Sequence, residues 1–268
     1  SGTATEVTAF SIITDYNKGI KYPIADFEIT PDVAIVDPDL VATLPQKLIA
    51  HTGMDAMTHS IEAYVSTAHT DYTDPLALHA IRMINADLEG SYNGDLEKRE
   101  KMHNAQCLAG MAFSNALLGI VHSMAHKTGA AFADKGAHII HGAANAMYLP
   151  KVIAFNAKNA EAKKRYCEIA DLINLGGTSA DEKIQNLIKR LRELQKTLNI
   201  PLCIKNYGAD SYPAENGFVS EDVFLQRVSD IAKNAVADAC TLSNPREISP
   251  EQMEKLLKCC YYDTEVDF

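Results

Sequence analysis

The sequence lacks two patterns that define large classes of proteins. It has no cluster of basic residues, and its formal net charge at pH 7 is −10. Surfaces that bind a phosphate backbone or an anionic lipid need concentrated positive charge, so nucleic acid and membrane are poor partners. No apolar run approaches the roughly 20 residues that span a bilayer, and residues 1–6 have neither a basic start nor a hydrophobic signal core. Nothing in the sequence predicts export.

The six cysteines show neither metal-type spacing nor a disulfide framework. The adjacent residues Cys259 and Cys260 are a poor arrangement for a disulfide. We therefore expect reduced thiols and a cytoplasmic location.

Strand-like segments are scarce beyond residue 40. The β-branched runs at residues 7–13 and 33–37 predict strands, and residues 15–19 between them predict a turn. A mostly parallel sheet needs repeated strand–helix alternation, and only its last traces could lie within residues 7–37. We expect that further sequence once preceded Ser1.

From Pro45 onward the apolar residues follow a helical period. Pro45 suits a first helical turn, and Ile49, Met57, Ile61 and Val65 lie on one stripe. Hydrophobic residues make up 47% of the chain, which is enough for a sizeable core. The predicted fold is mainly α. Further helices are expected near residues 75–92, 97–118, 120–132, 143–157, 160–173, 181–197, 221–236 and 249–261.

Asp55 and His59 are the first candidate pair for chemistry. They lie four residues apart on a strongly helical segment, so both side chains project from one face and a single ion could bridge them. The alternative is a solvated stripe, because His51, Asp55, His59 and Glu62 also fit an exposed helical face.

A second cluster holds four of the nine histidines: His122, His126, His138 and His141. His122 and His126 again have helical spacing and lie among apolar residues, so their face is not solvated. Carbonyls or waters could satisfy one such imidazole. For four imidazoles, together with a helix that presents Asp and His, a shared cation is the more economical explanation.

Three neutral imidazoles and one carboxylate would give a site with a net charge near +1 around a divalent ion, with room for a substrate oxygen. Such a Lewis acid could polarise a carbonyl for hydride attack or lower the pKa of a bound alcohol. The ligand types do not decide between iron and zinc.

Three local sequences resemble the signatures of iron-containing alcohol dehydrogenases. They are residues 53–64 (GMDAMTHSIEAY), 122–130 (HSMAHKTGA) and 141–146 (HGAANA). Residues 1–8, 21–26 and 31–37 resemble the cofactor-side segments of that family in the same order, so the match spans the chain. Residues 165–171, 199–201 and 244–246 resemble most closely the carboxy-terminal dehydrogenase half of bifunctional aldehyde/alcohol dehydrogenases.

The resemblance implies a fold, a metal site and a substrate class. It implies the helical metal-binding domain of the iron-dependent alcohol dehydrogenase fold over residues 41–268, preceded at 1–40 by a short β remnant of a nucleotide-binding α/β domain. Asp55, His59, His122 and His141 would bind Fe²⁺, or alternatively Zn²⁺. His126 would line the substrate cavity beside the metal as a proton relay.

The resemblance also implies the cofactor NAD and a small alcohol or aldehyde substrate. Gly2 and Thr3 would lie by the phosphate and nicotinamide portions of the cofactor, Lys21 near its ribose, and Leu40 against the adenine side. The expected reaction is hydride transfer between NAD(H) and a short primary alcohol or its aldehyde, and we expect a homo-oligomer.

Two features depart from the family pattern. The Gly-Gly-Gly-Ser loop that cradles the pyrophosphate is missing, so we expect a truncated chain that holds metal while binding NAD poorly. The spacer at residues 132–141 is several residues longer than usual. We prefer His141 to His138 as the last ligand, because residues 142–146 follow His141 as the pattern requires.

Two other functions compete with this one. A glycerol-type dehydrogenase usually presents fewer histidine ligands, and the ligand set here disfavours it. A non-catalytic helical metal-binding or oligomerisation domain would have a closed shell of four ligands without an exchangeable position.

Overall fold

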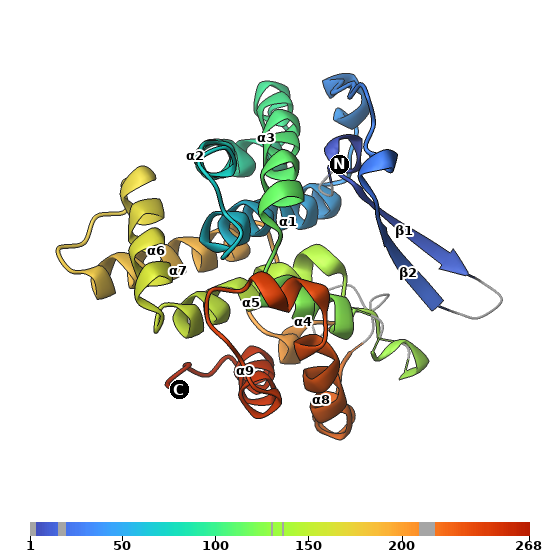
Figure 1. Cartoon of the computed structure of the whole chain (residues 1–268), viewed down its shortest axis with the longest axis vertical. Coiled ribbons are helices and arrows are strands. Elements are labelled where there is room, and N and C mark those ends of the chain that lie inside the picture. The colour runs from blue at the N-terminus through green and yellow to red at the C-terminus, as the bar shows by residue number, and fades with distance from the viewer. Residues whose placement is uncertain (1–3, 16–19, 130, 136, 209–217) are drawn as a thin grey trace.

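The computed structural model describes residues 4–15, 20–129, 131–135, 137–208 and 218–268. The side chains of residues 12–23 and 133 lie outside this description. Within the described part the chain is mainly helical, as predicted, and short 3₁₀ segments connect many of the helices (Figure 1).

Each predicted helix is confirmed, with ends shifted by a few residues. The helices are α1 (Gln46–Val65), α2 (Thr73–Tyr92), α3 (Leu96–Ala116), α4 (Ile120–Thr128), α5 (His141–Asn156), α6 (Ala160–Leu172), α7 (Ala180–Thr197), α8 (Glu221–Val236) and α9 (Pro250–Tyr262). The largest difference is at α4, which ends at Thr128 rather than near residue 132. Pro45 caps α1, and its carbonyl accepts hydrogen bonds from the amides of Leu48 and Ile49.

The strand prediction was only half right. Strand β1 (Phe10–Asp15) pairs antiparallel with β2 (Ile20–Ala25), with Phe10 opposite Ala25. The predicted strand at residues 33–37 is wrong, and these residues form an irregular segment before the 3₁₀ helix η3 (Pro38–Val41). Val33 and Ile35 are 77% and 81% exposed, and a β-branched run forms a strand only where a neighbouring strand completes its hydrogen bonds.

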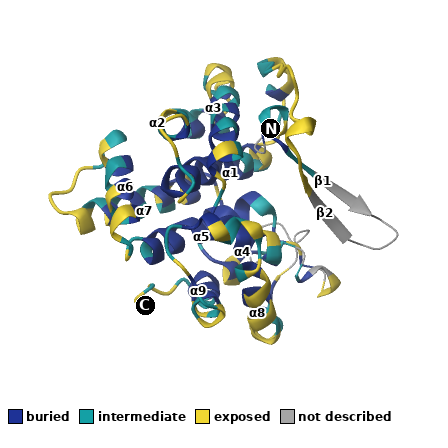
Figure 2. Ribbon diagram, in the orientation of Figure 1, coloured by how far each residue is buried: buried dark blue, intermediate teal, exposed yellow. Residues whose placement is uncertain are grey.

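Helix α1 lies at the centre of the helical part and packs against α2, α3 and α5 (Figure 1). Helix α4 packs between α5 and α8. Every residue of α1 from 53 to 65 is buried, so this stretch of the helix has no solvated face (Figure 2). A helix that is buried all round is normally apolar. The buried Asp55, His59 and Glu62 are therefore exceptions that need partners.

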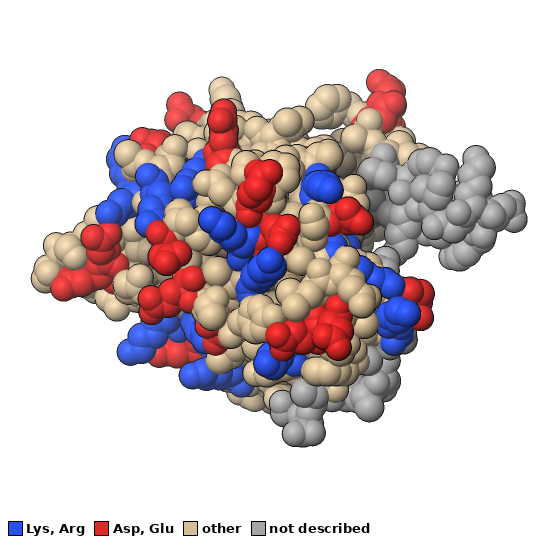
Figure 3. All heavy atoms as spheres, turned by 90° about the horizontal axis from the view of Figure 1, so that it is seen from below, with Lys and Arg blue, Asp and Glu red and all other residues tan. Residues whose placement is uncertain are grey.

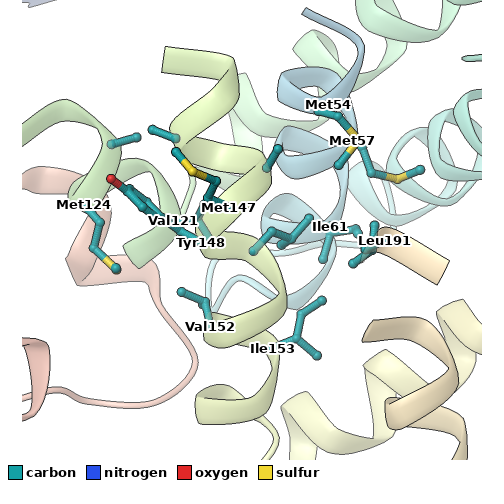
Figure 4. Packing of buried hydrophobic residues seen from close by; sticks show 14 of the residues in the cluster. Met54, Met57, Ile61, Val121, Met124, Met147, Tyr148, Val152, Ile153 and Leu191 are labelled. Atoms are coloured by element: carbon teal, nitrogen blue, oxygen red, sulfur yellow. The ribbon is translucent and has the colours of Figure 1, made fainter. Parts of the chain in front are cut away.

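The apolar core is continuous across α1, α4 and α5. Met54, Met57 and Ile61 of α1 belong to the same buried cluster as Met124 of α4 and Met147 of α5 (Figure 4). The polar residues of α1, α4 and α5 are held on this rigid, tightly packed frame.

The distribution of surface charge and the state of the cysteines match what the sequence predicted. On the face drawn in Figure 3, acidic and basic side chains are interspersed. All six cysteines are free. Among the described residues no single helix is long and apolar enough to cross a membrane, although α3 and α4, bent by 102° at their junction, pass that test together on length and composition alone.

Candidate metal centre

Helix α1 contributes Asp55 and His59 from its buried face. They are 3% and 5% exposed, and Oδ1 of Asp55 lies 3.9 Å from Nε2 of His59, one turn along the helix. His51 and Glu62, which share this stripe, are each 4% exposed. The alternative of a solvated helical face is therefore wrong, because all four polar residues are buried.

Helices α4 and α5 bring two imidazoles to the same carboxylate. Oδ1 of Asp55 lies 3.6 Å from Nε2 of His122 and 3.5 Å from Nε2 of His141. The rings of His59 and His122 stack with their centroids 4.6 Å apart. Ligand atoms that surround a tetrahedral ion at about 2.0–2.2 Å lie roughly 3.3–3.6 Å from one another, so these separations suit one shared cation. Among the described residues, the candidate ligand atoms of Asp55, His59 and His122 all lie within 4.8 Å of one another, and the fourth predicted ligand, His141, reaches this group through its contact with Asp55.

Asn145 lies one helical turn after His141 and occupies the middle of this group. Its amide nitrogen is 2.6 Å from Oδ1 of Asp55 and 3.2 Å from Nε2 of both His122 and His141. The amide NH₂ donates to Oδ1 of Asp55, and its second hydrogen can be accepted by Nε2 of His122 or His141 when that nitrogen carries no proton. The acceptors thus converge on one point that attracts positive charge, which is where a cation would fit. The oxygen of Asn145 and Nδ1 of His59 are buried without a hydrogen-bond partner.

Two of the histidines are in the protonation state that a metal ligand needs. Burial lowers the pKa of His59 to about 3 and that of His141 to about 4, although Asp55 opposes both shifts. Both rings are therefore neutral at physiological pH, as ligation requires. Burial also lowers the pKa of His122, but Glu62 and Asp55 outweigh it and raise that pKa to about 9. Burial raises the pKa of Asp55, and the surrounding histidines outweigh it and hold that pKa well below its usual range.

His126 lies beside the candidate ligands on the solvent side. Its side chain is 40% exposed, and its ring stacks on that of His141 with centroids 5.4 Å apart. Its Nδ1 is 3.4 Å from Oδ2 of Asp238, which also pairs with Nζ of Lys127 at 2.8 Å. The side chain of His141 is 39% exposed. One side of the cluster therefore faces solvent, and His126 lies at its edge.

The other predicted site residues lie outside this cluster. His138 is exposed, and only its carbonyl has a described partner, the hydroxyl of Tyr207. Leu40 lies in η3 and is 76% exposed. Gly2 and Thr3 lie outside the described residues, as does the side chain of Lys21. Leu40 is therefore the one predicted cofactor contact whose side chain the structure describes, and it lies exposed in η3.

The sequence did not predict the roles of Asn145 and Asp238, and it left the role of Glu62 open. Asn145 follows His141 by four residues, and this spacing could have placed it on the same helical face. Asp238 comes from the turn after α8 and carries no local signal. Glu62, which the sequence placed on a stripe that could have been solvated, is buried against His122.

These observations define a helical domain in which three helices bring a carboxylate and imidazoles to one point. A family model described as "Fe-containing alcohol dehydrogenase family, C-terminal" matches residues 49–261. The chain belongs to this family. It is 57% identical over 268 residues to an NADPH-dependent butanol dehydrogenase of Clostridium saccharobutylicum, covering 100% of this chain and 65% of that protein. It is 39% identical to the bifunctional aldehyde-alcohol dehydrogenase AdhE of Escherichia coli, covering 98% of this chain and 30% of that protein.

Solved structures agree. An iron-containing alcohol dehydrogenase from Thermococcus thioreducens matches with a TM-score of 0.84 and 33% identity, covering 98% of this chain and 62% of that one. A 1,3-propanediol oxidoreductase matches with a TM-score of 0.85 and 33% identity, covering 97% and 64%. The chain thus spans less than two thirds of the length of these relatives.

Proposed function

We propose that this chain carries the metal centre of an alcohol dehydrogenase that interconverts a short primary alcohol and its aldehyde by hydride transfer with a nicotinamide cofactor. The observation that carries the proposal is the convergence of His59, His122 and His141 on Oδ1 of Asp55, at 3.5–3.9 Å. The family and its named relatives support the substrate class.

The cation of this proposal is Fe²⁺, with Zn²⁺ as the alternative. Asp55, His59, His122 and His141 would hold it, and when bound it would supply Lewis acidity toward the oxygen of the substrate. We assign this function to residues 41–268, and contacts to the nucleotide to residues 1–40 through Gly2, Thr3, Lys21 and Leu40. The cofactor of the proposal is NAD(H). The butanol dehydrogenase relative is named NADPH-dependent, so NADP(H) is tested beside it.

His126 would move the proton in this reaction. Its ring lies against His141, and its Nδ1 contacts Asp238, a carboxylate that also pairs with Lys127. A partly exposed imidazole at the edge of the cluster can exchange protons with solvent and with a substrate hydroxyl. The solvent-facing side formed by His126 and His141 favours catalysis over a closed structural site.

The test compares metal content and activity across single variants. Protein purified without oxygen is analysed for metal and assayed with butanol or butyraldehyde and each nicotinamide cofactor. His141→Ala is expected to lower metal content strongly, whereas His138→Ala retains it and serves as the matched control. Equal metal loss in both variants would overturn the choice of His141. Because a chain that binds NAD poorly can hold metal without turning over alcohol, the non-catalytic alternative is favoured only if the bound metal has four protein ligands and no exchangeable position.

A further inference from the structure

Glu62 joins α1 to α4 through both of its carboxylate oxygens. Oε2 lies 2.5 Å from Nδ1 of His122, and Oε1 accepts a hydrogen bond from the amide of Val121 at 2.8 Å. The side chain is 4% exposed. A buried carboxylate with two such partners is held in one geometry.

The start of α4 is shaped to admit this carboxylate. A Cβ at Gly119 would lie 2.7 Å from Oε1 of Glu62 and 3.0 Å from Oδ1 of Asn244. Any larger residue would push the carboxylate away from the helix. The amide of Val121 lies in the first turn of α4, where amides lack partners within the helix and the helix dipole favours negative charge. Glu62 thus fixes both the beginning of α4 and the ring of its third residue, His122.

An ionised carboxylate can only accept hydrogen bonds. When His122 is neutral, its single ring proton must therefore lie on Nδ1, facing Glu62. This leaves the lone pair of Nε2 facing Asp55 and Asn145, at 3.6 and 3.2 Å. Which nitrogen of a ligating histidine is available depends on the hydrogen bond that the other nitrogen makes.

Glu62 also changes the charge of the site. With Asp55 as its only carboxylate, the site would have a net charge near +1 around a divalent ion. With Glu62 as a second carboxylate, buried in contact with His122, two negative charges balance the two positive charges of the ion. Burying a balanced group of charges costs much less than burying an unbalanced one.

We propose that Glu62 is a positioning residue that sets the tautomer of His122, so that the affinity of the site for a cation depends on a carboxylate that does not touch the ion. This inference rests on the proposed metal site. It goes beyond that site by adding a residue that holds one ligand in its binding form.

The test is Glu62→Gln, which keeps the shape of the side chain. Glutamine has one accepting oxygen and one donating nitrogen, while Val121 and His122 both offer hydrogens. If the oxygen faces Val121, the nitrogen donates to Nδ1 of His122 and moves the ring proton to Nε2, which blocks ligation. If the oxygen faces His122, the NH₂ group of the glutamine faces the amide N–H of Val121. Two hydrogen-bond donors then point at each other, and neither has an acceptor there. Loss of such a supporting contact typically lowers metal affinity by about 10–100-fold.

Co²⁺ is the probe, added to metal-free protein and followed by its visible absorption, with helix content checked by circular dichroism. The matched control is Glu182→Gln. Glu182 is exposed and accepts hydrogen bonds from the amides of Thr178 and Ser179 at the start of α7. The Glu182→Gln variant also loses hydrogen bonds at the start of a helix, but away from the site. Its Co²⁺ affinity should therefore equal that of the wild type.

A folded Glu62→Gln protein that binds Co²⁺ as tightly as the wild type, with the same spectrum, overturns the inference and leaves the metal site standing. A wild-type protein that binds no Co²⁺ overturns the metal site, and the inference with it. A second measurement does not depend on how the variant folds. In the Zn²⁺-loaded wild type, nitrogen NMR should show the proton of His122 on Nδ1, and coordination through Nδ1 would contradict the inference.

Discussion

Gly142 lies directly against the carbonyl of His51. A Cβ on Gly142 would fall 2.2 Å from that carbonyl oxygen and 2.6 Å from its carbon, both of which are backbone atoms of α1. Only a glycine allows α5 to approach α1 this closely. The contact places His141, the residue before Gly142, within 3.5 Å of Asp55.

Gly142→Ala should therefore force the two helices apart. Overpacking of this kind typically costs about 1–3 kcal/mol, and the backbone of α1 cannot move aside as a flexible side chain would. We expect a lower free energy of unfolding in urea together with weaker metal binding. Gly90→Ala is the control, because the atoms nearest to its Cβ would belong to the flexible side chain of Lys98. That change should leave metal binding intact, and equal metal affinities in the two variants would argue against this role of Gly142.

Asn145→Ala should destabilise the metal-free protein more than the metal-loaded protein. The amide nitrogen serves Asp55, His122 and His141, and a cation would take over these acceptors. Unsatisfied buried acceptors cost about 1–3 kcal/mol, and this loss should appear only without metal. The measurement is thermal unfolding with EDTA and with Zn²⁺. Asn156→Ala, which breaks a buried amide pair with Asn244, should cost the same in both conditions. Equal losses for Asn145→Ala would contradict the prediction.

His51 should make the stability of the protein depend on pH. Burial lowers its pKa to about 4, and the charge of Lys47 adds to this effect. The unfolded chain, with a histidine pKa near 6.5, binds a proton below that pH while the folded chain does not. The free energy of unfolding therefore falls as the pH drops from about 6.5 to about 4, by at most about 1.4 kcal/mol per pH unit from this group.

His51→Gln should make that dependence shallower by about one proton, as measured by urea unfolding at several pH values in EDTA. The control is His79→Gln, since His79 is exposed on α2 and its replacement should leave the slope unchanged. An identical slope for the wild type and His51→Gln would rule out His51 as the source.

Arg99→Lys should loosen the segment before α1. Arg99 is 6% exposed, and its guanidinium donates to the carbonyls of Val41 and Ala42 and to both the hydroxyl and the carbonyl of Ser91. A lysine cannot reproduce this fork, and charged hydrogen bonds contribute about 1.5–3 kcal/mol each. We expect lower stability in urea and faster proteolysis between η3 and α1. Unchanged values of both would show that these contacts contribute little.

The helices could be predicted from the sequence because their signals are local. The apolar stripe that begins at Ile49 repeats within a few residues, and its period depends on no distant partner. The strand predicted at residues 33–37 does not form, because a strand depends on more than its local sequence. Its β-branched residues fit a strand, but a strand also needs a neighbouring strand, and Val33 and Ile35 are exposed among the described residues.

The sequence by itself determined the helices and the supply of carboxylate and imidazole side chains. The sequence pattern also favoured His141 over His138, and the structure places His141 beside Asp55. The tertiary structure alone decided that Glu62 is buried against His122 and that Asn145 lies beside Asp55. The reason is distance along the chain: 60 residues separate Glu62 from His122 and 90 separate Asp55 from Asn145. These contacts depend on how α1, α4 and α5 pack against one another, which no local pattern encodes.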